Sequence, residues 1–194
     1  RWGVCVSNPV RAVEKSIERK PKRYVTDEEY RHVWNCSTER MRVAMDLALL
    51  TGLRRGDLIG LRKSDVTDEG IIVRPSKTAD TTAVALLIER SPELDAVIER
   101  AKRIKPHIGP GNFLLRTREG NGYTADGFSA NFRRAVDKAI KAHGIARFAF
   151  HDIRRKSASD SASLQEAQER LGHSSEAVTR RFYIARPVRV RPLR

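Results

Sequence analysis

Residues 150–183 read FHDIRRKSASDSASLQEAQERLGHSSEAVTRRFY and contain His151, Arg154, His173 and Tyr183 in that order. The spacing of His151 and Arg154 places an imidazole and a guanidinium one helical turn apart, so both side chains can face a single anion. His173 adds a second imidazole, and Tyr183 adds a phenol. Metal-free phosphodiester chemistry needs a nucleophile, proton-transfer groups and cations for the charge that develops on phosphorus oxygens. The stretch holds all of these parts.

The charge balance of the chain predicts a polyanionic partner. Its 194 residues include 38 Lys and Arg against 24 Asp and Glu, a net charge of +14. The hydrophobic fraction of 40% is that of a globular protein with room for a core. No apolar run reaches the length of a membrane-spanning helix, and no signal peptide opens the sequence. Nucleic acid is therefore expected in preference to a membrane, although a basic surface without a partner also fits the charge.

The two cysteines, Cys5 and Cys36, form no CxxC motif, and the sequence has no Cys/His cluster at metal-ligand spacing. We therefore expect a reducing compartment, no structural zinc and no cofactor. The sequence also contains no carboxylate cluster that would hold catalytic metal ions, which disfavours a metal-dependent nuclease.

Helical patterns dominate the chain, so the expected class is mainly α with a small antiparallel sheet. Thr26 and Glu29 have the form of a capping box, Gly52 and Gly144 are natural helix stops, and Ser175 is a natural helix start. The patterns predict helices over 38–50, 92–104, 128–143 and 164–171, and strands over 70–73 and 83–87. In the last helix, Val178 and Phe182 are expected to face the core.

The sequence resembles the tyrosine recombinases of the phage integrase family in four motifs. HDIRR, LGHSS and a following tyrosine look like the C-terminal signature of that family. Upstream, LLTGLRRGDLIGLRKSDV is similar to its first arginine box, which maps the catalytic arginine onto Arg54 and an acidic companion onto Asp57. IIVRPSKTADTTAVALL resembles the hairpin of the catalytic lysine, here Lys77. Arg55 beside Arg54 fits either a surface charge or a contact to the DNA backbone.

The resemblance implies the tyrosine recombinase catalytic-domain fold and a role for each matched residue. Tyr183 would be the nucleophile and would form a 3′-phosphotyrosyl link without metal or ATP. Arg54, Arg154 and His173 would bind the phosphate, and His151 would assist proton transfer. Lys77 would protonate the leaving 5′-oxygen.

The resemblance also implies a domain plan and partners. Residues 1–24 would be the end of a truncated N-terminal core-binding domain plus a basic linker, 25–183 the catalytic domain, and 184–194 a tail that docks on a neighbouring subunit. The expected partners are double-stranded DNA attachment sites, a homotetramer on DNA and accessory DNA-bending proteins. The expected location is cytoplasmic, associated with the nucleoid, and the expected source is a phage or another mobile element.

Several alternatives stay open at the level of sequence. Taken singly, His173 also fits a histidine at a helix junction, and Tyr183 fits a core aromatic. Tyr183 follows His173 by ten positions, where nine is common in the family, and KSASDSAS after HDIRR is small and polar where an apolar helix is expected. For function, the alternatives are a type IB topoisomerase-like strand cleavage and rejoining activity, or a non-catalytic DNA-binding module.

Overall fold

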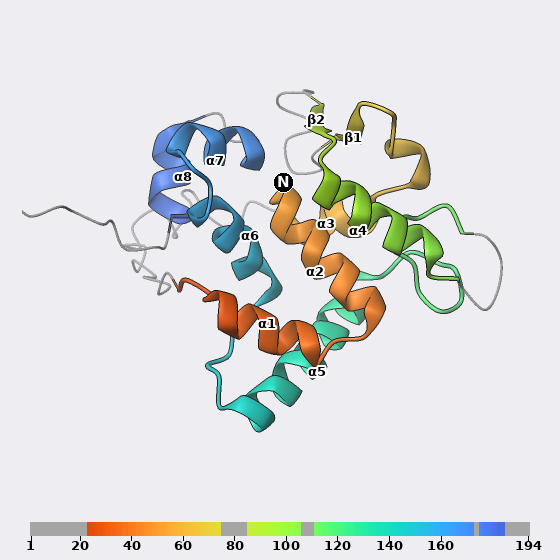
Figure 1. Cartoon of the computed structure of the whole chain (residues 1–194), viewed down its shortest axis with the longest axis vertical. Coiled ribbons are helices and arrows are strands. Elements are labelled where there is room, and N and C mark those ends of the chain that lie inside the picture. Colours follow the sequence, from red (N-terminus) through yellow and green to blue (C-terminus); the bar gives the residue numbers. More distant parts are fainter. Residues whose placement is uncertain (1–22, 75–84, 106–110, 173–174, 185–194) are drawn as a thin grey trace, which may run out of the picture.

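The computed structural model describes residues 23–74, 85–105, 111–172 and 175–184 (Figure 1). The predictions for Lys77, His173, the leader before residue 23 and the tail after residue 184 lie outside these residues. The described elements, in chain order, are α1 (Asp27–Asn35), α2 (Glu39–Thr51), α3 (Arg55–Gly60), η2 (Lys63–Asp65), β1 (Gly70–Val73), β2 (Leu86–Glu89), α4 (Pro92–Arg103), α5 (Ala125–His143), α6 (Phe150–Ser159), α7 (Leu164–Leu171) and α8 (Glu176–Phe182). The mainly helical class with a small antiparallel sheet is confirmed.

Local capping signals fix most helix ends where the sequence predicts them. Thr26 and Glu29 form the capping box that opens α1, and Ser91 caps α4. α2 and α5 end at Gly52 and Gly144, whose φ values of 64° and 65° are left-handed. These boundaries depend on single residues, which is why the sequence alone could locate them.

Helix α2 lies at the centre of the molecule, packed against α1, α4 and α6 (Figure 1). Seven of its thirteen residues are buried, including Met45 and Leu47 at 0% exposure. A helix that is apolar on most of its surface is stable only when neighbours cover it on several sides. The segments on either side of α2 are therefore fixed relative to the whole domain.

The sheet has two antiparallel strands, in which Gly70 pairs with Glu89 and Val73 pairs with Leu86. β1 has the predicted bounds, but β2 covers 86–89 rather than 83–87. Residues 83 and 84 lie outside the described part, and Ala85 is not in a strand. Because the apolar run continues to Ile88, hydrophobicity alone did not fix the register, which is set by pairing with β1.

The buried apolar residues form two separate groups. The larger one, here called the main core, extends from Val25 to Ile153 and includes residues of α1 to α6. The smaller one, here called the small cluster, has three buried residues, Ala158, Ala167 and Leu171, with Tyr183 and Ile184 packed against them. Helix α6 contributes to both groups, so it joins the main core to α7 and α8.

Two features of the C-terminal helices differ from expectation. Val178 is 39% exposed, whereas Thr179 is fully buried, so the prediction that Val178 faces the core is wrong. The side chain of Phe182 lies outside the described part. KSAS after HDIRR continues α6 as a helix and has buried Lys156, Ser157 and Ala158. In the described part of the chain, no helix is both long enough and apolar enough to cross a membrane.

Candidate active site

Arg54 is positioned by a sharp turn between α2 and α3. Gly52 ends α2 in the left-handed region, Leu53 is buried, and Arg54 is the N-cap residue of α3. Asp57 lies in the first turn of this short helix and is 9% exposed. The sequence analysis predicted no helix here. The helix explains the spacing of Arg54 and Asp57, because three residues form about one turn.

Arg154 lies in α6 with only 3% of its surface exposed. One guanidinium nitrogen donates to the carbonyl oxygen of Gly52, and another donates to the carbonyl oxygen of Leu171 at 2.8 Å. Arg154 therefore connects the end of α2 to the end of α7. Burial and the nearby charge of Arg54 lower the pKa of Arg154 to about 10, so the guanidinium is still charged at neutral pH.

His151 is in the first turn of α6, with its imidazole 5.8 Å from the ring of Tyr183, centre to centre, in an edge-to-face arrangement. One side of the imidazole is open to solvent. The surrounding protein atoms still remove enough water to lower its pKa, and the charges of Arg155 and Arg154 lower it further. His151 is therefore mostly neutral at pH 7 and able to accept a proton.

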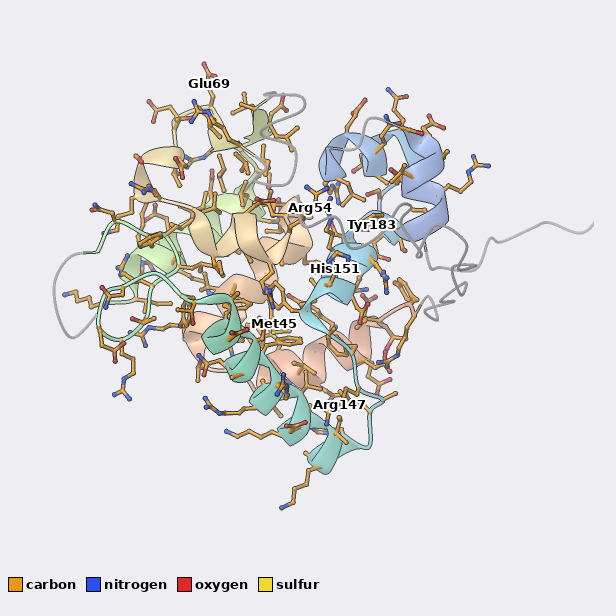
Figure 2. All side chains as sticks on the ribbon, turned by 180° about the vertical axis from the view of Figure 1, so that it is seen from behind. Met45, Arg54, Glu69, Arg147, His151 and Tyr183 are labelled. Atoms are coloured by element: carbon orange, nitrogen blue, oxygen red, sulfur yellow. The ribbon has the colours of Figure 1, made fainter. Side chains whose placement is uncertain are left out.

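Tyr183 is the C-cap residue of α8 and is half-buried against the small cluster. Its ring lies 5.2 Å from Cζ of Arg154, and its backbone oxygen accepts a hydrogen bond from Ser159 at 3.2 Å. The phenol thus has a guanidinium and an imidazole beside it. Figure 2 shows Arg54, His151 and Tyr183 around one region between α3 and the C-terminal helices.

The described structure therefore brings together four of the six expected site residues: Arg54, His151, Arg154 and Tyr183. The other two, Lys77 and His173, lie outside the described residues. The chain approaches His173 through Leu171, whose carbonyl oxygen accepts from Arg154, and Gly172, which ends α7 with a φ of 60°.

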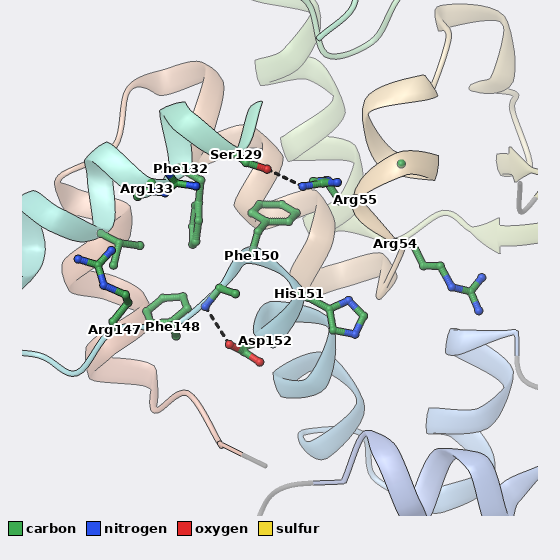
Figure 3. A pocket seen from close by; sticks show the side chains of 13 residues that line it. Arg54, Arg55, Ser129, Phe132, Arg133, Arg147, Phe148, Phe150, His151 and Asp152 are labelled. Carbon is green, nitrogen blue, oxygen red and sulfur yellow. Dashed lines mark hydrogen bonds between the residues drawn. The ribbon is translucent and has the colours of Figure 1, made fainter. Parts of the chain in front are cut away.

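An open cavity of about 690 Å³ adjoins this group (Figure 3). Phe132, Phe148 and Phe150 line it on the side facing α5. Figure 3 shows the Arg54 side chain extending away from these rings, with the imidazole of His151 between them. Four arginines contribute to the lining: Arg54, Arg55, Arg133 and Arg147.

The sequence analysis recognised this surface only in part. Arg147, which directly precedes Phe148, was not among the predicted site residues. Arg55 donates a hydrogen bond to the hydroxyl of Ser129 on α5, a contact between distant residues that no local pattern reveals. In the described residues, no group of three His, Cys, Asp or Glu side chains is arranged to hold a metal ion.

Comparison with known proteins shows to which family the chain belongs. The model of the phage integrase family matches residues 23–187. The chain belongs to the phage integrase family. The predicted family resemblance is thereby confirmed, over the whole region that contains the described elements.

Individual phage integrases are similar to this chain at moderate identity. The integrase of Mycobacterium phage L5 is 25% identical over 96% of this chain and 54% of its own length. The integrase of Escherichia phage lambda is 26% identical over 93% of this chain and 52% of its own length. The chain thus spans about half the length of these integrases.

Solved structures of the phage integrase family support the fold. The lambda integrase catalytic core matches with a TM-score of 0.65 and 25% identity, over 77% of this chain and 91% of that chain. A lambda integrase dimer bound to a COC′ core site matches with a TM-score of 0.74 and 24% identity, over 97% of this chain and 69% of that chain. The expected catalytic-domain fold is confirmed.

Proposed function

We propose that this chain is the catalytic part of a site-specific DNA recombinase that cleaves and rejoins DNA through a 3′-phosphotyrosyl intermediate. The observation that carries the proposal is the position of Tyr183, whose ring lies against both His151 and Arg154. A phenol is an ordinary residue in a protein core. A half-buried phenol beside a charged guanidinium and a neutral imidazole suits attack on a phosphodiester.

In the proposed first step, Arg54 and Arg154 bind the non-bridging oxygens of the scissile phosphate, together with His173. A guanidinium can donate two parallel hydrogen bonds to a phosphate, which an ammonium cannot do. The contacts of Arg154 with Gly52 and Leu171 hold its guanidinium in place before DNA arrives. Such preorganised donors stabilise the transition state without reorganisation.

The oxygen of Tyr183 then forms a bond to phosphorus, and the bond from phosphorus to the 5′-oxygen breaks. His151 takes the phenolic proton, which is a suitable task for an imidazole whose pKa is lowered. Lys77 supplies a proton to the departing 5′-oxygen, which leaves as a hydroxyl. A 5′-hydroxyl from a second DNA strand can reverse the step, so no external energy source is needed.

The proposed partners are double-stranded attachment sites, a second, third and fourth copy of the chain on that DNA, and accessory DNA-bending proteins. The net charge of +14 supports a DNA partner. A solved relative is a lambda integrase tetramer bound to a Holliday junction. The proposed location is the cytoplasm, associated with the nucleoid.

The proposed domain plan gives residues 1–24 to the end of a core-binding domain and linker, and residues 184–194 to docking on a neighbouring copy. The tail is basic, with the sequence IARPVRVRPLR. A cavity of about 680 Å³ between β2 and α7 supports docking by its charge, because the acidic residues in its lining outnumber the basic ones. The acidic residues are Asp27, Glu89, Asp160, Glu166 and Glu169, and the basic ones are Lys156 and Arg170. Deletion of 185–194 should weaken assembly on DNA, as measured by sedimentation of the complexes.

The test of the activity is a covalent protein–DNA adduct on nicked suicide duplexes made from the DNA that flanks the source element. Tyr183→Phe should abolish the adduct. Tyr123→Phe is the matched control, because Tyr123 is a partly buried phenol that packs edge-to-face on Phe128. Loss of the adduct in both variants, or in neither, would reject Tyr183 as the nucleophile.

The same assay separates the alternatives. The match to the phage integrase family does not favour a topoisomerase, which would relax supercoiled plasmid without an attachment site. Salt-sensitive DNA binding without any adduct would leave the non-catalytic binding module. Addition of the N-terminal residues that longer phage integrases have should restore activity if only the length of the chain limits it.

A further inference from the structure

Lys156 is a fully buried cation two residues beyond Arg154 in α6, with 1% of its surface exposed. Its ammonium donates to the Tyr24 hydroxyl at 3.2 Å, to Asp160 Oδ2 at 2.8 Å and to Asp27 Oδ1. Burial alone lowers the pKa of a lysine, but the hydrogen bonds with Asp160, Asp27 and Tyr24 outweigh it and raise the pKa of Lys156. The ammonium is therefore charged at neutral pH, and it binds the end of α6 to the start of α1.

Arg23 makes similar contacts at the other end of α6. Its guanidinium donates to the carbonyl oxygens of Ala146 at 2.9 Å and of Arg147 at 2.5 Å. Its Cζ lies 5.8 Å from the ring centre of Phe148, and it forms an ion pair with Glu29. The segment that leads into α6 is therefore held by the same short stretch of chain.

Residues 23–27, here called the strap, thus contact both the segment that leads into α6 and the later part of α6, the helix that carries His151 and Arg154. The strap is itself fixed, because Val25 is fully buried in the main core and Thr26 caps α1. The polypeptide that precedes residue 23 is joined covalently to the strap, and the strap is linked to α6 by hydrogen bonds and an ion pair. A change in the path of that polypeptide can reach the candidate site by this route.

The Lys156 contacts contribute more to orientation than to stability. Asp27 is 80% exposed and Asp160 is 31% exposed, so both carboxylates can be hydrated if the ammonium is removed. Removing one partner of a buried ion pair is costly when the other charge stays buried, but here the charges that remain are carboxylates that water can reach. Stability alone therefore gives little reason for a buried lysine here, whereas a defined orientation of α6 does.

We propose that Lys156, together with Tyr24, is a positioning residue that sets the orientation of α6, and through it the placement of His151 and Arg154 against the scissile phosphate. The proposal rests on the recombinase function proposed above. It assigns to the strap a role in coupling the upstream part of the chain to the rate of cleavage.

The test is Lys156→Met in the full chain, with Lys102→Met as the matched control. Lys102 pairs with Glu99 at 2.8 Å on the surface of α4, so the control loses one ammonium and one ion pair, whereas Lys156→Met loses one ammonium and two ion pairs. The cleavage rate of a bound suicide duplex and the dissociation constant for the same duplex are measured separately. We expect Lys156→Met to lower the rate by about 10-fold or more, because small misplacements of catalytic groups have large effects on rate. Its dissociation constant and melting temperature should match those of Lys102→Met.

A second variant tests whether Tyr24 acts through the same contacts as Lys156. Tyr24→Phe keeps the ring but removes the hydroxyl that donates to Asp160 at 2.6 Å and accepts from Lys156. Its rate should fall less than that of Lys156→Met. The double variant should cleave no more slowly than Lys156→Met alone, because both changes remove contacts of the same network.

The proposal would be overturned if Lys156→Met cleaves at the wild-type rate. It would also be overturned if the rate falls only because less of the variant is folded. If the wild-type chain forms no adduct, the proposed function fails and the strap is tested by NMR instead. The proposal then expects the signals of His151 and Arg154 to shift in Lys156→Met and to stay in place in Lys102→Met. Unshifted signals would reject it.

Discussion

The main core and the small cluster hold different parts of the candidate site. Arg54 caps α3 and His151 lies in the first turn of α6, and the buried residues nearest to them along the chain belong to the large main core. Tyr183 instead rests on three buried residues, Ala158, Ala167 and Leu171. Segments with few buried apolar contacts open at a lower free energy than a core does. Arg54 and the proposed base His151 therefore have a rigid support, and the proposed nucleophile has a weaker one.

The largest effect is expected where the two regions are joined. Arg154→Lys keeps one charge, but a single ammonium cannot donate to Gly52, Leu171 and a phosphate in the same geometry. We expect the cleavage rate to fall by about 100-fold to 1000-fold, the range for loss of a transition-state donor. Single-turnover cleavage on a suicide duplex measures it. A variant that cleaves at the wild-type rate would show that the guanidinium has no special role.

The next prediction tests whether the two regions unfold separately. Leu171→Ala in the small cluster and Leu47→Ala in the main core remove the same atoms from sites that are 1% and 0% exposed. Each should cost about 2 to 5 kcal/mol. Amide hydrogen exchange should accelerate only in α7 and α8 for Leu171→Ala, and throughout the domain for Leu47→Ala. Equal acceleration of exchange throughout the domain in both variants would show that the main core and the small cluster unfold as one cooperative unit.

A smaller effect is expected at the glycine that ends α7. Gly172 and Gly144 both have left-handed φ values, so alanine at either position should cost about 1 kcal/mol. A Cβ at Gly172 would also lie 2.7 Å from Leu86 Cδ1, whereas a Cβ at Gly144 has open space. Urea unfolding should therefore give a larger loss for Gly172→Ala. Equal losses would show that Leu86 moves aside freely.

The smallest expected effect is a shift in the pH dependence of the cleavage rate. Burial and then the charge of Arg155 lower the pKa of His151 below 6.5. Because the proposed base must be neutral, cleavage should fall as pH drops through this lowered pKa. Arg155→Gln removes one depressing charge, so the acid limb of the rate profile should move to higher pH. Arg103→Gln, on α4, is the control and should leave the limb in place. A shift to lower pH would contradict the assigned role of Arg155.

Local signals explain how much of the fold could be predicted. The capping box at Thr26, the stops at Gly52 and Gly144 and the cap at Ser175 act within one turn, so the sequence located them. The register of β2 depends on its partner strand. The buried face of α8 depends on α6 and α7, and the choice between Val178 and Thr179 could not be made from periodicity in so short a helix.

The residues of the candidate site also divide into those that short motifs reveal and those that depend on contacts between distant segments. Short motifs were enough to nominate Arg54, His151, Arg154 and Tyr183, and the structure brings these four together. The burial of Lys156 was not predicted, because its partners Tyr24 and Asp27 are about 130 residues away in sequence. The sequence shows the local partner Asp160, four residues further on, but it gives no sign that the distant Asp27 and Tyr24 also contact the ammonium. The roles of Lys77 and His173 stay predictions.

Gly52 has a consequence for how freely this sequence can change. It has a left-handed φ of 64°, its carbonyl oxygen accepts from Arg154, and a Cβ there would lie 3.2 Å from Leu171 Cδ2. The left-handed backbone and the limited space each disfavour a side chain here, and the hydrogen bond from Arg154 to the carbonyl fixes the backbone in this conformation. A library with all twenty amino acids at position 52, selected for recombination, should therefore return almost only glycine codons. The neighbouring position of Arg55, exposed at the start of α3, should accept many residues.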